Sequence, residues 1–105
     1  GTYIPSSDRA LKSDIKPIGY GLSAINAMLP SSYLFNQEAE VRAASNLPPI
    51  RHLGFIAQDV EPVIPELVQS VGEHLGVDYT GIVPVLVKAI QELSAEVEAL
   101  KAKVG

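Results

Sequence analysis

Hydrophobic residues near the C-terminus recur three and four positions apart, without a break, from residue 83 to residue 104. This spacing is the heptad repeat of a coiled coil, in which positions a and d are apolar. A stripe so narrow and regular is not satisfied by one helix alone, so it predicts self-association through a long helix over residues 81–105. The stripe, called the seam below, has Val83, Ile90, Val97 and Val104 at a and Leu86, Leu93 and Leu100 at d.

Residues beside the seam indicate how the helices pair. Glu96 falls at g and Lys101 at the following e, which are the positions that parallel, in-register helices bring together. β-Branched residues at a with leucine at d favour two strands, whereas Val87 at e and Ala89 at g widen the apolar face and favour more than two. The heptads therefore leave the number of associating helices open. The alternative to association is a single amphipathic helix lying on its own domain.

Short apolar segments separated by proline and glycine indicate a small body over residues 7–80, preceded by an extended arm over residues 1–6. Thr80 is expected to cap the long helix, with Pro84 tolerated in the first turn. The predicted fold class is therefore α+β, a mixed body of short helices and β-hairpins followed by a long C-terminal helix. The body is expected to begin with a short helix or tight turn capped from Ser6, Ser7 or Asp8, followed by a helix over 22–29. Strands over 33–35 and 53–56 are expected to pair across a polar segment over 37–49, which is interpreted as a loop or a poorly packed excursion, with Gly54 allowing a bulge or a close backbone approach. A helical segment over 57–64 and a hairpin with strands over 67–71 and 75–79 complete the body.

Length and composition narrow the function classes. A body of roughly 80 residues forms only a marginally stable core, and association would make good that deficit. The net charge is −4 and the basic residues are scattered, so no nucleic acid partner is expected. No apolar run approaches the roughly 18 residues of a membrane span and no signal peptide is visible, so no membrane partner is expected either. The absence of cysteine removes disulfide and thiolate chemistry, and Gly1 in place of a methionine suggests a fragment of a longer protein.

Most patterns that carry chemistry are missing. His52 and His74 have no second ligand at metal spacing, so no metal is expected, and they are interpreted as solvated or hairpin-tip residues. No carboxylate pair and no G-x-S-x-G turn stands out. Residues 19–24 match the G-x-G-x-x-A phosphate pattern, but no buried strand precedes them and Pro30 stops the following helix early. They are interpreted as a turn, and no cofactor is expected.

One candidate catalytic arrangement remains, with Ser7 five residues before Lys12. A buried, neutral lysine can accept the proton of a serine hydroxyl and so activate the serine as a nucleophile. Residues five apart lie about 140° around a helix, and an odd separation puts them on opposite faces of a strand. Pairing these two side chains therefore requires a bend between them or a lysine from a neighbouring chain; a capping serine and a surface lysine are the alternative.

Three ordered motifs cover nearly all of residues 7–103. Taken together, they resemble the C-terminal intramolecular chaperone domain of phage tail spikes and tail fibres, as in endosialidases, which is shared with some other self-cleaving trimeric proteins. The motifs are Ser7-Asp8-Arg9-Ala10-Leu11-Lys12-Ser13-Asp14-Ile15, then Gly54-Phe55-Ile56-Ala57-Gln58-Asp59-Val60 with Pro65-Glu66-Leu67-Val68, and then Val77-Asp78-Tyr79 with Ala89-Ile90-Gln91-Glu92-Leu93.

The resemblance implies a parallel homotrimeric coiled coil behind a β-rich fibre of the same chain, which makes residues 1–6 a remnant of that fibre. It implies that the domain guides assembly and then cuts itself off at the Ser6–Ser7 bond, with Ser7 as nucleophile and Lys12 as general base. The expected location is the bacterial host cytoplasm during phage assembly, with release from the mature fibre after cleavage.

Two other interpretations stay open at this stage. One is a non-catalytic trimerisation module that remains attached to a fibre or surface protein. The other is a nucleotide-responsive module built on the glycine turn at residues 19–21, which nucleotide would stabilise against heat.

Overall fold

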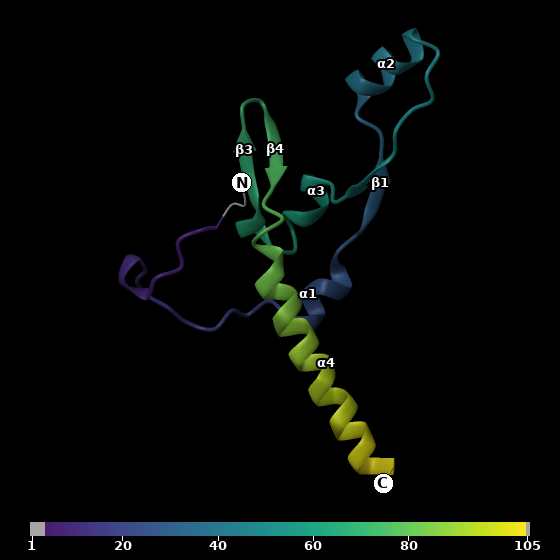
Figure 1. Cartoon of the computed structure of the whole chain (residues 1–105). Coiled ribbons are helices and arrows are strands. Elements are labelled where there is room, and N and C mark those ends of the chain that lie inside the picture. The colour runs from purple at the N-terminus through teal and green to yellow at the C-terminus, as the bar shows by residue number, and fades with distance from the viewer. Residues whose placement is uncertain (1–3, 105) are drawn as a thin grey trace.

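The computed structural model describes residues 4–104, so the expected arm over residues 1–6 lies partly outside the described residues. Figure 1 shows a small body at the root of one long helix, which confirms the mixed α+β class and the long C-terminal helix. In chain order the elements are η1 (Arg9–Leu11), α1 (Leu22–Ala27), β1 (Ser31–Tyr33), α2 (Asn36–Ala44), β2 (His52–Gly54), α3 (Ala57–Val60), η2 (Pro65–Leu67), β3 (Val68–Val71), β4 (His74–Val77) and α4 (Ile82–Val104).

The core lies where α1, α3 and η2 meet the first turns of α4. Its buried side chains are 1–8% exposed, and no polar or charged residue of the described chain is buried with them. The proline at residue 65 opens η2 and turns the chain, so that apolar residues on both sides of it reach the same cluster. The buried members of the cluster are Met28, Val60, Ile64, Leu67, Ile82 and Val85.

The hairpin of β3 and β4 agrees with the prediction to within two residues. Its register pairs Val68 with Val77 and Val71 with His74, and Gly72 takes a positive φ of 62° at the turn. Left-handed backbone favours glycine, which explains the residue at this point. β3 begins one residue later than expected because Leu67 belongs to η2 and is buried in the core, and β4 ends at Val77, two residues earlier than expected.

The start of α4 corrects the expectation that Thr80 caps the helix. The Thr80 hydroxyl donates to Asp78 Oδ1 at 2.6 Å, and the Gly81 N–H donates to the same oxygen at 3.2 Å. These hydrogen bonds, that of Thr80 first, hold the pKa of Asp78 below its ordinary value, because they stabilise the ionised carboxylate. Asp78 therefore provides the carboxylate that caps the turn leading into α4, and Pro84 lies in the first turn of the helix as predicted.

Residues 31–54 form an arm that stands away from the core, with β1 and β2 at its base and α2 at its tip (Figure 1). The expected strand pair is present, with Ser31 opposite Gly54 and Tyr33 opposite His52, but β1 lies two residues earlier than predicted. The sequence predicts a loop or a poorly packed excursion over residues 37–49. The loop is wrong for residues 37–44, which belong to α2, whereas the excursion is confirmed because α2 buries none of its residues. Alanine, glutamate and arginine favour this helix. Hydrophobic periodicity does not predict it, because it buries no apolar face.

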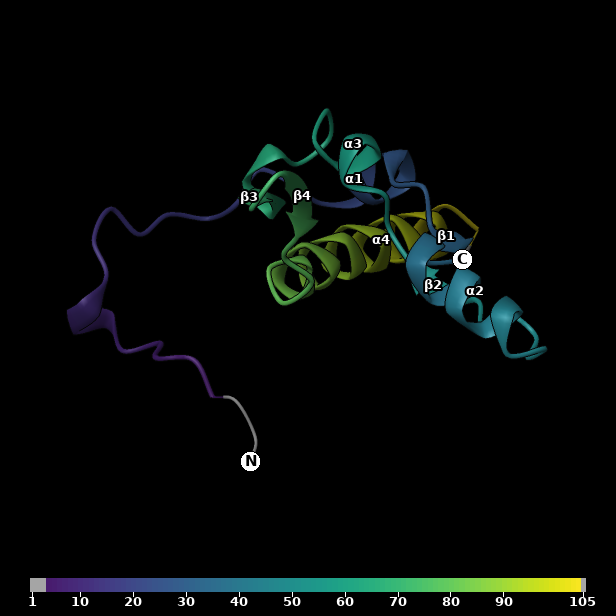
Figure 2. The same ribbon diagram turned by 90° about the horizontal axis from the view of Figure 1, so that it is seen from above.

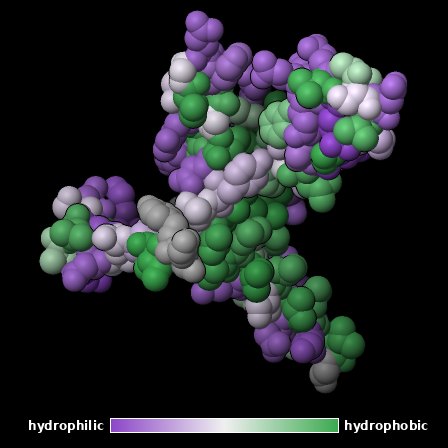
Figure 3. All heavy atoms as spheres, turned by 45° about the horizontal axis from the view of Figure 1, so that its top comes forward, coloured by the Kyte–Doolittle hydropathy of each residue, from purple (hydrophilic) through white to green (hydrophobic). Residues whose placement is uncertain are grey.

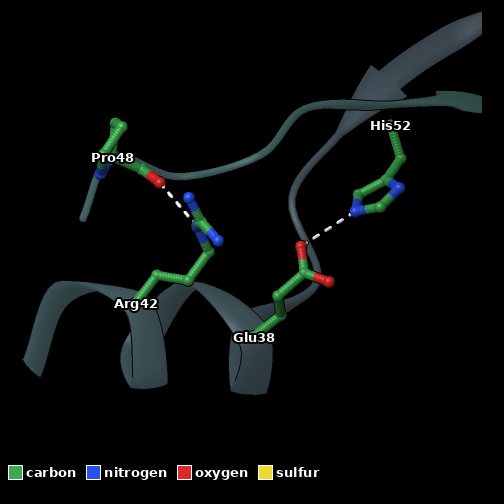
Figure 4. Close-up of polar contacts among 4 residues, drawn as sticks. All are labelled: Glu38, Arg42, Pro48 and His52. Atoms are coloured by element: carbon green, nitrogen blue, oxygen red, sulfur yellow. Dashed lines mark hydrogen bonds and ion pairs between the residues drawn. The ribbon is translucent and has the colours of Figure 1, made fainter. Parts of the chain in front are cut away.

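Polar contacts hold the tip of the arm together, as Figure 4 shows. Arg42 Nε donates to the carbonyl oxygen of Pro48 at 2.7 Å, which ties α2 to the returning chain. Glu38 Oε1 lies 2.9 Å from His52 Nε2, which ties the first turn of α2 to β2. The rings of Tyr33 and Phe35 pack against the His52 ring beside the second contact, so aromatic packing and hydrogen bonds together hold this part of the chain.

The base of the arm is fastened to the body through Tyr79. The Phe55 N–H donates to the Tyr79 hydroxyl at 2.9 Å, and a Cβ atom on Gly54 would collide with that hydroxyl. The expectation that Gly54 permits a close approach is thereby confirmed. Burial, followed by hydrogen bonding to Tyr79, raises the pKa of the Tyr33 phenol. Tyr79 thus joins the arm to the chain that leads into α4.

Candidate functional site

Residues 4–18 are called the strap below. Figure 2 shows most of the strap running well clear of the body, which it joins at its end, where Pro17 and Ile18 lie beside α4. Every residue of the strap is exposed, including the large apolar side chains of Ile4, Leu11 and Ile15. Burying a large aliphatic side chain contributes about 1.5–3 kcal/mol, so leaving several in water is unfavourable. The strap is therefore a segment whose apolar residues are not covered by its own chain.

A tight turn separates Ser7 from Lys12. Asp8 Oδ1 accepts a hydrogen bond from the Ala10 N–H at 2.9 Å, and the Lys12 N–H donates to the carbonyl oxygen of Arg9 at 3.1 Å. Asp8 is thus the capping residue among the three expected candidates, and η1 is the expected short turn. The backbone therefore turns between Ser7 and Lys12.

In the single chain, the side chains of Ser7 and Lys12 are surrounded by solvent. Both residues are exposed, as are Ser6 before them and Asp14 and Lys16 beyond. The ion pair of Lys16 with Asp14, at 3.5 Å, is equally exposed and contributes little. A lysine acts as a base when burial disfavours its charged form, and the isolated chain supplies no such burial at Lys12. The roles of Ser7 and Lys12 stay predictions.

The seam is uncovered along the whole of α4. Its side chains are 41–89% exposed, although every one is valine, leucine or isoleucine. Figure 3 shows hydrophobic side chains gathered where the body meets α4 and continuing down the helix. The chain offers this stripe to solvent, which is the arrangement expected of a surface that a partner covers. The exposed members are Val83, Leu86, Ile90, Leu93, Val97, Leu100 and Val104.

A different flank of α4 packs against the body. Ile82 and Ala89 at g, together with Val85 at c, are buried against it. Ala89 is therefore not available to widen the seam, contrary to the expectation from its position in the heptad. The alternative of a helix lying on its own domain describes only this c/g flank, because the a and d side chains remain outside.

The paired charges beside the seam need a second helix to be tested. Lys101 Nζ lies 3.4 Å from Glu98 Oε1 of its own helix, and both side chains are largely exposed. The pairing of Glu96 at g with Lys101 at e of a neighbour stays a prediction.

The glycine-rich turn has a structural use. The Leu22 N–H at the start of α1 donates to Glu92 Oε1 of α4 at 3.0 Å, and a Cβ atom on Gly21 would collide with that carboxylate. Glu92 thus occupies the place that the G-x-G-x-x-A pattern would give to a phosphate. The interpretation as a turn is confirmed. The helix α1 ends at Ala27, two residues earlier than expected. Sequence reasoning missed Glu92; the glycine before α1 indicates only that the first N–H groups of the helix need an acceptor from elsewhere in the chain.

Other residues offer little chemistry. His52 is held by Glu38 in the arm, and His74 is exposed at the hairpin turn. Among residues 4–104, no three of histidine, cysteine, aspartate and glutamate gather as a metal site would require. Within the same range, no helix combines the length and the apolar character needed to cross a membrane.

Comparison with known proteins adds to this geometry. A family model described as "Chaperone of endosialidase", which is named for a peptidase, matches residues 7–69, more than half of the chain. The chain belongs to the chaperone of endosialidase family. The match begins at Ser7. The "Probable tail fiber protein" of Escherichia phage Phieco32 is 35% identical over 110 residues, which cover 96% of this chain. The chain spans only 14% of the length of that relative.

Proposed function

We propose that this chaperone domain brings three copies of an upstream phage tail fibre together and then separates from them by cutting the Ser6–Ser7 bond. The observation that carries the proposal is the uncovered seam on α4, in a chain of the chaperone of endosialidase family. The tail fibre relative supports the nature of the upstream protein. Three chains in register at their ends would align the fibre segments ahead of them.

The proposed cut uses groups of the strap alone. Ser7 Oγ attacks the carbonyl carbon of Ser6 while Lys12 Nζ accepts the hydroxyl proton. The C–N bond between the two serines breaks, Lys12 returns the proton to the departing amine of Ser7, and an ester joins Ser6 to Ser7 Oγ. Water then hydrolyses the ester, which leaves a carboxylate on Ser6 and restores the hydroxyl.

Assembly would switch this chemistry on. The turn at η1 supplies the bend, while the burial that a lysine base needs is absent from the single chain. A neighbouring copy would supply that burial, so unassembled chains would stay uncut. Once the domain has left, the fibre could no longer unfold by the route it used to fold, and its stability would be kinetic.

A longer precursor, with a few dozen native residues ahead of Ser7, tests the cut. Mass spectrometry should find a product that begins at Ser7, and Ser7→Ala and Lys12→Ala should each abolish it. Ser13→Ala and Lys16→Ala are the matched controls, because they remove the same groups from exposed positions in the same strap. A wild-type precursor that stays whole, or that is cut at another bond, contradicts the proposal.

The exposure of Lys12 favours a second candidate, a trimerisation module that stays attached and cuts nothing. Under that function the precursor would assemble fully and remain one polypeptide. Measuring the mass of the assembly and of its chains on the same sample separates the two functions.

A further inference from the structure

The helix α4 has three distinct flanks near the body, and two of them have been described. The c/g flank is buried against the body through Ile82, Val85 and Ala89. The a/d seam is exposed. The remaining e/b flank carries the exposed residues Pro84 at b and Val87 at e beside the body, and Pro84 also borders a cavity lined by Ile64 and Leu67.

A groove of about 500 Å³ runs along this e/b flank. One wall is the end of the strap and the other is α4, so the groove joins the strap to the edge of the seam. Ile18, Val83 and Val87 are each exposed there in the single chain. The residues that line the groove and enter the argument are Pro17, Ile18, Val83, Pro84, Val87 and Gln91.

The heptad register decides what lies opposite the groove in an assembly. In parallel, in-register helices, the e position of one helix faces the g position of the next. Here the g residues Ile82 and Ala89 are covered by their own body, and Glu92 at c accepts a hydrogen bond from Leu22 of α1. The surface that a neighbour presents at this height is therefore its body around α1.

We propose that the groove receives the body of the neighbouring copy, at the surface around α1, and that this contact clamps the end of the strap. The inference rests on the proposed function for its parallel assembly and explains how assembly reaches the cutting segment. It makes the interface heterologous, since the e/b flank of each copy meets the c/g side of the next and three such contacts close a ring.

The consequence concerns Ile18, from which the strap leaves the body. In the single chain the strap is exposed from Ile4 to Ile15, and only its end at Pro17 and Ile18 lies beside α4. Filling the groove buries Ile18 and holds the strap at the point from which it leads to Lys12 and Ser7. Reactive groups need a restricted geometry to react at a useful rate, so a strap that is clamped only in the assembly would be cut only in the assembly.

The chain has no cysteine, so single cysteines can report on burial without interference. In Ile18→Cys, labelling by a maleimide dye should be about tenfold slower in the assembled protein than in the same variant carrying Leu93→Asp, because the reagent must wait for the interface to open. Glu98→Cys, at the exposed b position beyond the body, is the matched control and should react equally in both. In the longer precursor, Ile18→Asn should leave the trimer mass unchanged and slow the cut about tenfold or more.

Each outcome decides a separate point. A trimer in which Ile18→Cys reacts as fast as in the Leu93→Asp background, or in which Ile18→Asn is cut at the wild-type rate, overturns the clamp and leaves the proposed function standing. A protected Ile18→Cys in a precursor that is never cut supports the docking of the neighbour, overturns its role in cutting and rejects self-cleavage. A wild-type protein that stays monomeric overturns both.

Discussion

Replacing Leu93 by aspartate should prevent assembly. Leu93 is 48% exposed in the single chain, and fully burying a leucine contributes about 1.5–3 kcal/mol, so the half that remains to be buried contributes about 1 kcal/mol per copy. Three copies lose about 3 kcal/mol from this source, which weakens association about a hundredfold. The substitution also brings three unpaired carboxylates together at the centre of the seam, and the desolvation cost is several kcal/mol for each ion.

Sedimentation equilibrium over a range of concentrations measures this effect. The wild-type chain should approach three times its own mass of 11.2 kDa, whereas Leu93→Asp should remain at the mass of one chain. Ala95→Asp is the matched control, since it introduces the same charge at the outward f position two residues away. In the longer precursor, Leu93→Asp should also remove the cut at Ser7. Leu93→Asp protein with wild-type mass would refute the role of the seam, and efficient cutting by a monomer would refute the coupling.

Two further predictions concern the body. Gly21→Ala should displace Glu92 from the start of α1 and lower the free energy of unfolding by about 1 kcal/mol, as for a lost helix cap, in thermal or denaturant unfolding. Gly19→Ala is the control, because a Cβ atom there meets no other atom within 4 Å. Equal effects of the two substitutions would contradict the role of Glu92. The pKa of Asp78 is lower in the folded chain than its ordinary value of 3.8, so the carboxylate stabilises the fold above that pH, and the contribution is lost as the pH falls through the folded pKa. Asp78→Asn should therefore flatten the acid side of the stability profile, and an unchanged profile would contradict the capping role.

The arm shows where pattern analysis reached its limit. Periodicity detects a helix through the apolar face that it buries, and α2 buries none. Its stability comes from local propensity and from side-chain contacts such as Arg42 with Pro48, which depend on where the chain returns. The strand pair at the base of the arm was predictable, because apolar and aromatic residues typical of strands occur both before and after α2.

Helix caps raise a related difficulty. Asp78 and Thr80 are both good capping residues, and only the backbone path into α4 places the aspartate within reach of the Gly81 N–H. Glu92 is still harder to predict from the sequence, because it caps a helix that lies seventy residues earlier in the chain. Contacts of this kind depend on distances in space that spacing along the chain does not encode.

By itself, the sequence determined that a long helix would carry a regular apolar stripe and that a small mixed body would precede it. It also determined that Ser7 and Lys12 could meet only across a bend or between neighbouring chains. Each of these follows from local chain geometry, because the spacing of residues along a helix or strand sets the face on which their side chains lie. The tertiary structure alone decided which flank of the helix the body covers, that Ala89 belongs to the core, and that a groove joins the strap to the seam. The physical reason is that several flanks of α4 are apolar, and packing against segments distant in sequence selects which of them is buried.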